Sequence, residues 1–212
     1  MNKPLFFRKP FKYCYFHATL AIIIINVLVF VLSRIMPYLN AYLALSPLGI
    51  IGGGYYWQFI TYMFAHVNFN HILFNMLGLL FFGIPLEKQL GSKEFLLFYL
   101  VTGFFSGLLS FLIFTFLKIN VFLLGASGAI YAILFAYAVG FPRSVIFIWG
   151  ILPVPAPILV AVYTVIEIVS EVFGASNTAH LTHLFGFLFA WLYMLIRMGI
   201  HPIRVWKAAF RK

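Results

Sequence analysis

Three separated stretches of the sequence carry the residue types that serine-based hydrolysis needs. A serine hydroxyl becomes a nucleophile when a base takes its proton, and histidine is the natural base at neutral pH. Asparagine and a further histidine can donate hydrogen bonds to an oxyanion. The three stretches contain His66, Asn68, Asn70, His71 and Asn75, then Gly125, Ala126, Ser127 and Gly128, and then His180, Thr182 and His183.

The acidic residues limit which carboxylate could assist a serine nucleophile and its histidine base. The sequence contains no aspartate and only 4 acidic residues, all glutamates, which excludes a Ser-His-Asp triad. Glu167 and Glu171 lie four residues apart, on one face of a helix. We expect both near water, at the outer end of their membrane span. They could orient a histidine, but a Ser/His dyad is the favoured prediction.

The elements that must position these residues are membrane-spanning helices. Of the 212 residues, 64% are hydrophobic and 8% are charged, whereas a soluble domain carries about 25% charged residues. This composition excludes a soluble enzyme, a disordered chain and a nucleic-acid-binding module, although the net charge is +10. At roughly 20 residues per span, the chain accommodates about six spans.

Charged residues, proline and glycine divide the chain into six predicted spans within a single membrane domain, residues 1–212. The irregular but Tyr- and Trp-rich stretch 35–57 predicts a structured loop lying partly in the outer leaflet. We expect residues 144–156 to be interfacial and 197–212 to form a short amphipathic segment on the inner surface. The predicted fold is an all-α bundle of six transmembrane helices. The spans cover about 18–34, 66–86, 95–117, 127–141, 157–173 and 179–199.

The basic residues predict how the chain is oriented. With both termini in the cytoplasm, only Arg34 and Lys118 of the 14 basic residues lie on the outer side, in agreement with the positive-inside rule. The basic start, including Lys3 and Lys9, precedes an apolar run without a small-residue cleavage site. A retained first span is therefore favoured over a signal peptide. These patterns predict an integral, multi-pass protein of the plasma (inner) membrane.

The orientation also predicts that the polar residues converge. Spans two, four and six all run from outside to inside, and each carries its polar residues in its first half. His71 and Asn75, Ser127, and His180 or His183 therefore fall at a similar depth below the outer surface. Polar groups inside spans are costly, so such a group of residues indicates a functional site.

Small residues indicate which histidine faces the serine. Stripes of small residues let helices approach closely in lipid. Gly186 and Ala190 follow His183 at helical spacing, whereas His183 and the bulky Phe187 occupy the same spacing after His180. The register favours His183 as the base and leaves His180 as the alternative base. The facing stripe contains Gly128, Ala132, Ala136 and Gly140.

Over about residues 55–190, the chain resembles the rhomboid family of intramembrane serine proteases. Gly125-Ala126-Ser127-Gly128 resembles the family's GxSG motif. The other matching motifs are His66-x4-His71-x3-Asn75, like that of the family's second span, and His183-x2-Gly186-x3-Ala190, like that of its last span.

The resemblance implies a role for each matching residue. Ser127 would be the nucleophile and His183 its base, in a sequence context that includes Gly125 and Gly128. His71 and Asn75, together with the Ser127 N–H, would stabilise the oxyanion, and Tyr131 would pack on the imidazole of the base.

Two positions depart from the family pattern. Trp57 resembles the first residue of a Trp-Arg pair in the outer loop, but Gln58 replaces the Arg, which bears on the stability of the loop. Ala190 stands where Gly is usual. The family implies a serine endopeptidase with no cofactor or metal, acting in the lipid bilayer on transmembrane protein substrates and not on nucleic acid; the oligomeric state is left open.

Three other functions remain as alternatives. A catalytically silent rhomboid-like protein that binds transmembrane segments would typically have lost the serine or the base, and both are present. A metal or haem protein could use His66, His71, His180 and His183, but no HExxH motif supports a zinc protease. A transporter would usually show paired broken helices in matching halves, which are not found.

Overall fold

A computed structural model describes residues 8, 11–148, 150–173 and 179–211. Lys3 and Lys9 of the predicted basic start lie outside the described residues. Helices dominate the fold, which confirms the predicted all-α membrane bundle. The principal helices are α1 (Ala18–Ile35), α5 (Phe69–Gly78), α6 (Ile84–Leu90), α7 (Ser92–Phe116), α8 (Ser127–Gly140), α9 (Ala156–Phe173) and α10 (Ala179–Ile196).

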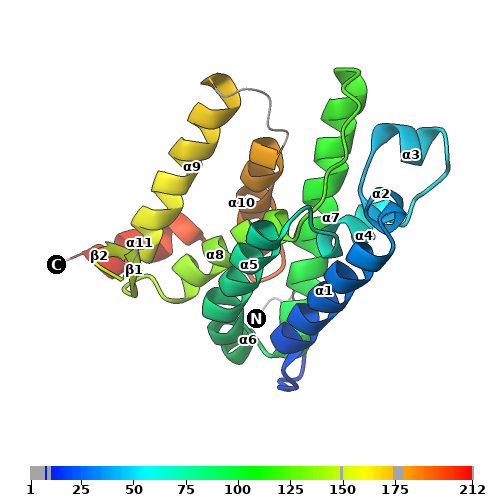
Figure 1. Cartoon of the computed structure of the whole chain (residues 1–212). Coiled ribbons are helices and arrows are strands. Elements are labelled where there is room, and N and C mark those ends of the chain that lie inside the picture. Colours follow the sequence, from blue (N-terminus) through cyan, green and yellow to red (C-terminus); the bar gives the residue numbers. More distant parts are fainter. Residues whose placement is uncertain (1–7, 9–10, 149, 174–178, 212) are drawn as a thin grey trace.

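Among the described residues, four stretches are long and apolar enough to cross a membrane, and two further apolar helices are shorter. The long ones are α1, α7, α9 and the continuous stretch Phe69–Leu90, which contains both α5 and α6. The shorter ones are α8 and α10. α9 stands at one side of the bundle and α1 at the other (Figure 1), while α8 contacts α5, α7, α9 and α10.

α8 is shorter than the hydrocarbon core of a bilayer is thick. Its 14 residues span about 20 Å at about 1.5 Å per residue, whereas the hydrocarbon core is about 30 Å thick. α8 is therefore roughly 10 Å shorter than the hydrocarbon core is thick, and Ser127 is its first residue.

The non-helical segment just before Ser127 forms backbone hydrogen bonds with other segments of the chain. Leu45 and Leu123 exchange backbone bonds of 2.9 and 2.8 Å, and the Gly125 N–H donates to the Tyr62 carbonyl at 2.9 Å. Non-helical backbone at membrane depth requires such partners.

The second span differs from its predicted range of 66–86. It begins at Phe69, because the side chain of Asn68 accepts the His71 N–H at 2.9 Å and caps the helix. It continues through a π-helical turn, Leu79–Gly83, to Leu90. The turn directly precedes Pro85, which has no N–H to continue the regular hydrogen-bond pattern.

The predicted end of this span was wrong because Glu87 is buried and does not face water. Its carboxylate accepts hydrogen bonds from the N–H groups of Ala18 and Thr19, at 2.6 and 2.8 Å, and from the Thr19 hydroxyl at 2.6 Å. The Ser92 hydroxyl also donates to it. A carboxylate suits a helix N-terminus, so Glu87 holds the start of α1 against α6.

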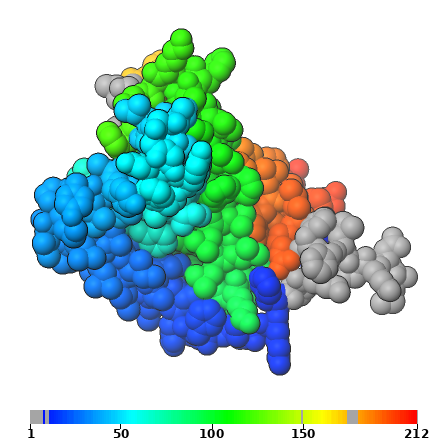
Figure 2. Space-filling view, turned by 90° about the vertical axis from the view of Figure 1, so that its right-hand side faces the viewer, coloured from blue at the N-terminus to red at the C-terminus, as the bar shows by residue number. Residues whose placement is uncertain are grey.

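The predicted structured loop 35–57 contains two short helices, α2 (Tyr38–Leu43) and α3 (Pro47–Ile51). It is followed by α4 (Gln58–Thr61). Seen from the side in Figure 2, the cyan segment lies over the upper part of α7. Both α3 and α4 contact α7.

Gln58 holds this loop together from within. Its side chain is buried. It accepts the Ser46 N–H at 3.1 Å and donates to the Tyr42 carbonyl at 3.2 Å. The Trp57 indole donates to the same carbonyl at 3.1 Å. The loop is thus stabilised by an amide where the family pattern has a guanidinium.

The stretch 144–156, which we expected to be interfacial, forms a β-hairpin that the sequence analysis did not predict. Its strands are β1 (Val145–Ile148) and β2 (Leu152–Pro155), antiparallel, with Val145 opposite Pro155. Within the expected amphipathic tail, α11 (Pro202–Phe210) docks on α8 because the Trp206 indole donates to the Ala138 carbonyl at 2.8 Å.

We predict that Gln58→Ala lowers the free energy of unfolding by about 1–3 kcal/mol, because it leaves buried partners unsatisfied. The measurement is SDS-induced unfolding of the purified protein in detergent micelles. Gln89→Ala, at an exposed position, is the control. Equal unfolding midpoints for the two variants would contradict the prediction.

Candidate active site

The site is centred on a contact between the first residue of α8 and the second turn of α10. The Ser127 Oγ lies 2.8 Å from the His183 Nε2. Both side chains are partly buried. A hydroxyl at this distance from an unprotonated imidazole nitrogen donates a hydrogen bond to that nitrogen, which is the contact that a serine nucleophile and its base require.

Two glycines allow this contact. A Cβ at Gly186 would overlap the Gly128 carbonyl oxygen and lie 3.2 Å from the Tyr131 Cβ. The backbones of α8 and α10 therefore approach closely one turn below His183. One turn before Gly186 on the same face of α10, the Thr182 and Ser110 hydroxyls hydrogen-bond at 2.7 Å, which ties α10 to α7.

Tyr131 supports the imidazole from one side. Its ring stacks on that of His183, with centroids 4.2 Å apart and planes 9° apart. Its hydroxyl donates a hydrogen bond to Glu167 on α9. The structure thus places Tyr131 against both the histidine and a carboxylate.

The expectation that Glu167 lies near water was wrong. It is 4% exposed, because it faces the bundle two turns below the end of α9. Its Oε1 lies 3.0 Å from the His183 Nδ1, and its Oε2 lies 2.5 Å from the His180 Nδ1. Glu171 is exposed, as expected. The structure therefore aligns Ser127, His183 and Glu167, where the sequence analysis favoured a dyad.

His180 occupies a different place from that of a base. Its Nδ1 is directed to Glu167, and its ring centroid is 6.3 Å from that of His183. Among the described residues, no hydrogen bond joins His180 to Ser127. Its contact with Glu167 makes it a third partner of the carboxylate, beside Tyr131 and His183.

His71 and Asn75 line one cavity with Ser127 and Tyr131, with a volume of about 520 Å³. Gly125 has φ +124°, and a Cβ there would lie 2.6 Å from the His71 Nε2. Glycine thus lets the imidazole approach the backbone just before the serine. The Asn75 amide donates to the His71 carbonyl at 2.7 Å within its own helix.

His66 lies behind His71. It is completely buried, and the two rings meet edge to face with centroids 5.0 Å apart. Its position limits the movement of His71, which suits a structural role.

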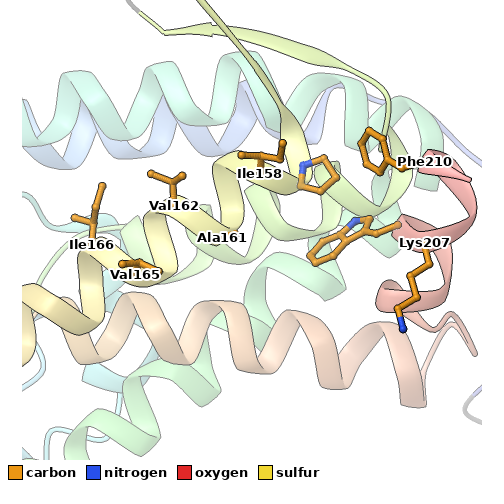
Figure 3. Close-up of a pocket in the computed structure, with 9 residues that line it drawn as sticks. Ile158, Ala161, Val162, Val165, Ile166, Lys207 and Phe210 are labelled. Carbon is orange, nitrogen blue, oxygen red and sulfur yellow. The ribbon is translucent and has the colours of Figure 1, made fainter.

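A larger cavity, of about 660 Å³, lies between α9 and α11 (Figure 3). Its walls include Ile158, Val162 and Phe210, and its charged residue is Lys207. Ser127 and His183 do not line it, so it is separate from the candidate site.

Three side chains could together hold a metal ion. One ligand atom each of Glu167, His180 and His183 lie within 4.8 Å of one another. Two imidazoles and a carboxylate are suitable zinc ligands. The same atoms are engaged in hydrogen bonds with one another, so a metal would have to replace these bonds.

Comparison with known proteins places this arrangement in a family. A family model described as the Rhomboid domain matches residues 53–200. The chain belongs to the rhomboid family. It is an integral, multi-pass membrane protein of that family, and the matched region contains Ser127 and all of its long apolar helices named above except α1.

Rhomboid relatives include proteins named as proteases. RHOMBOID-like protein 4 of Arabidopsis thaliana is 38% identical over 85 residues, 40% of this chain and 21% of the relative. Rhomboid protease GluP of Bacillus subtilis is 34% identical over 85 residues, 40% of this chain and 16% of the relative. Rhomboid protease GlpG of Serratia proteamaculans is 41% identical over 51 residues, 24% of this chain and 18% of the relative. The matches thus span 16% to 21% of the length of these relatives.

We predict that Gly186→Ala separates α8 from α10 in this rhomboid protein. The added methyl group has no room beside the Gly128 carbonyl, and such overpacking costs about 1–3 kcal/mol. SDS unfolding measures the loss. Leu188→Ala, at an exposed position on the same helix, is the control, and wild-type stability of Gly186→Ala would refute the close contact.

Proposed function

We propose that the chain is an intramembrane serine endopeptidase that cleaves peptide bonds in or near transmembrane segments of membrane proteins. One observation carries the proposal: the Ser127 Oγ lies 2.8 Å from the His183 Nε2, at the end of a helix roughly 10 Å shorter than the hydrocarbon core of a bilayer is thick. The family's protease-named members support the same activity.

The reaction follows from these two side chains. The Ser127 Oγ bonds to the carbonyl carbon of the substrate while its proton passes to the His183 Nε2, and the carbonyl π electrons move to the oxygen. The electrons return, the C–N bond breaks, and His183 gives the proton to the leaving nitrogen. Water, deprotonated by His183, then hydrolyses the acyl-enzyme and restores the serine.

The oxyanion is assigned to the cavity beside Ser127. The Ser127 N–H belongs to the unpaired donors at the start of α8. His71 and Asn75 line the same cavity and supply N–H donors. The Asn75 amide, which now donates to the His71 carbonyl, has a second N–H available for the oxyanion.

The walls of this cavity suit a transmembrane substrate. Phe74 and Phe81 on the second span, Leu134 on α8 and Tyr163 on α9 line it together with Ser127. An apolar segment bound between α5 and α9 would place its backbone near the nucleophile. We infer a single domain in a plasma (inner) membrane with both termini in the cytoplasm, as the distribution of basic residues predicts.

We predict that Ser127→Ala abolishes both cleavage of a transmembrane substrate in proteoliposomes and labelling by a fluorophosphonate probe, because the nucleophile is removed. Ser144→Ala removes a hydroxyl that donates to the Phe141 carbonyl three residues earlier; it serves as the matched control and should behave as wild type. A folded wild-type protein that binds the substrate without cleavage or labelling would instead indicate a silent binder of transmembrane segments.

We predict that cleavage survives incubation with EDTA, because side chains supply both the nucleophile and the base. The measurement compares rates before and after chelation, with a zinc-dependent protease in the same detergent buffer as the positive control. Loss of activity that Zn²⁺ restores would assign Glu167, His180 and His183 to a metal site instead.

A further inference from the structure

Glu167 contacts the catalytic imidazole on the side opposite the nucleophile. The Ser127 Oγ lies 2.8 Å from the Nε2 of His183, and the Glu167 Oε1 lies 3.0 Å from its Nδ1. The three side chains come from three helices, α8, α10 and α9. Such a line from hydroxyl through imidazole to carboxylate is the arrangement of a serine triad.

We propose that Glu167 is a positioning residue that holds His183 in the tautomer and orientation needed to deprotonate Ser127. The inference rests on the proposed protease function and adds a third group to the Ser/His pair. Glutamate replaces the aspartate that the sequence lacks.

The tautomer follows from the chemistry of the three groups. An ionised carboxylate only accepts hydrogen bonds, so the imidazole nitrogen that faces it must carry the proton. With the proton on Nδ1, the Nε2 of neutral His183 has a free lone pair directed at Ser127. Without the carboxylate, the proton could occupy Nε2, and the imidazole could not act as the base.

The carboxylate itself is held by further donors. The Tyr131 hydroxyl donates to Oε1, and the His180 Nδ1 lies 2.5 Å from Oε2. A buried charge is stable only when it is paired and hydrogen-bonded, and Glu167 is 4% exposed. These contacts fix the direction of the carboxylate and explain why His180 is present beside the pair.

The carboxylate also assists when charge develops. As the proton moves from Ser127, the imidazole becomes an imidazolium, and a fixed negative group beside it stabilises that charge. The effect is larger in the poorly hydrated interior than in water, because the local dielectric is lower. Glu167 touches only the histidine among the reacting groups, so its effect is exerted through His183.

The test compares Glu167→Gln with Glu171→Gln, which alters an exposed carboxylate one turn along α9. Cleavage of a transmembrane substrate is measured at several substrate concentrations in proteoliposomes. We expect Glu167→Gln to lower kcat by about 10²-fold or more, within the range of general acid–base groups, with KM unchanged. Glu167→Asp should recover part of kcat, and Glu171→Gln should match wild type.

A second measurement does not depend on the folding of a variant. In ¹⁵N-histidine-labelled wild type in micelles, at a pH where His183 is neutral, the His183 signals, identified by their loss in His183→Ala, should show protonation at Nδ1. Protonation at Nε2 would overturn the inference, as would a wild-type kcat in Glu167→Gln or a defect confined to KM. An inactive wild type would instead overturn the proposed protease function.

Discussion

The close approach of α8 and α10 is the constraint on which the site depends. Gly186 meets the backbone of Gly128, and this contact sets the distance between the two helices one turn from the Ser127–His183 contact. A hydroxyl and an imidazole on separate helices meet at hydrogen-bond distance only when their backbones are held at one spacing. The Thr182–Ser110 bond also ties α10 to α7. The packing of small residues thus allows the hydrogen bond between Ser127 and His183.

The proposed hydrolysis inside a bilayer would require non-helical backbone near Ser127, and such backbone needs hydrogen-bond partners. α8 begins only at Ser127, and the segment between the end of α7 and this residue is non-helical. Leu45 and Tyr62 supply the hydrogen bonds which that backbone needs. The loop that contributes Leu45 is itself held by Gln58. The loop 35–57 and the segment that leads to Ser127 are therefore parts of one hydrogen-bonded structure.

Much of the fold could be predicted from the sequence, because apolar runs and basic flanks are strong local signals. The choice of His183 over His180 could also be argued, since helical spacing from Gly186 is a local property. The role of Glu167 could not, because its partners lie on two other helices. A helical-face signal did exist: Ala156, Val160, Tyr163 and Glu167 recur at helical spacing and turn inward in α9. Glu87 was misjudged for the same reason, since its partners are far along the chain.

Ser127, His183 and Glu167 lie on three different helices, so their contacts depend on how α8, α10 and α9 pack together. α9 stands at one side of the bundle (Figure 1), and the preceding β-hairpin connects it to α8. Any outward swing of α9 that widens the cavity for a helical guest also stretches the 3.0 Å contact between Glu167 and His183. With α9 displaced, the His183 imidazole would lack its contact with the Glu167 carboxylate. In the proposed protease, the full basicity of His183 would then depend on α9 packing back against α10, so that the binding of a substrate helix and the cleavage of its backbone would be successive events.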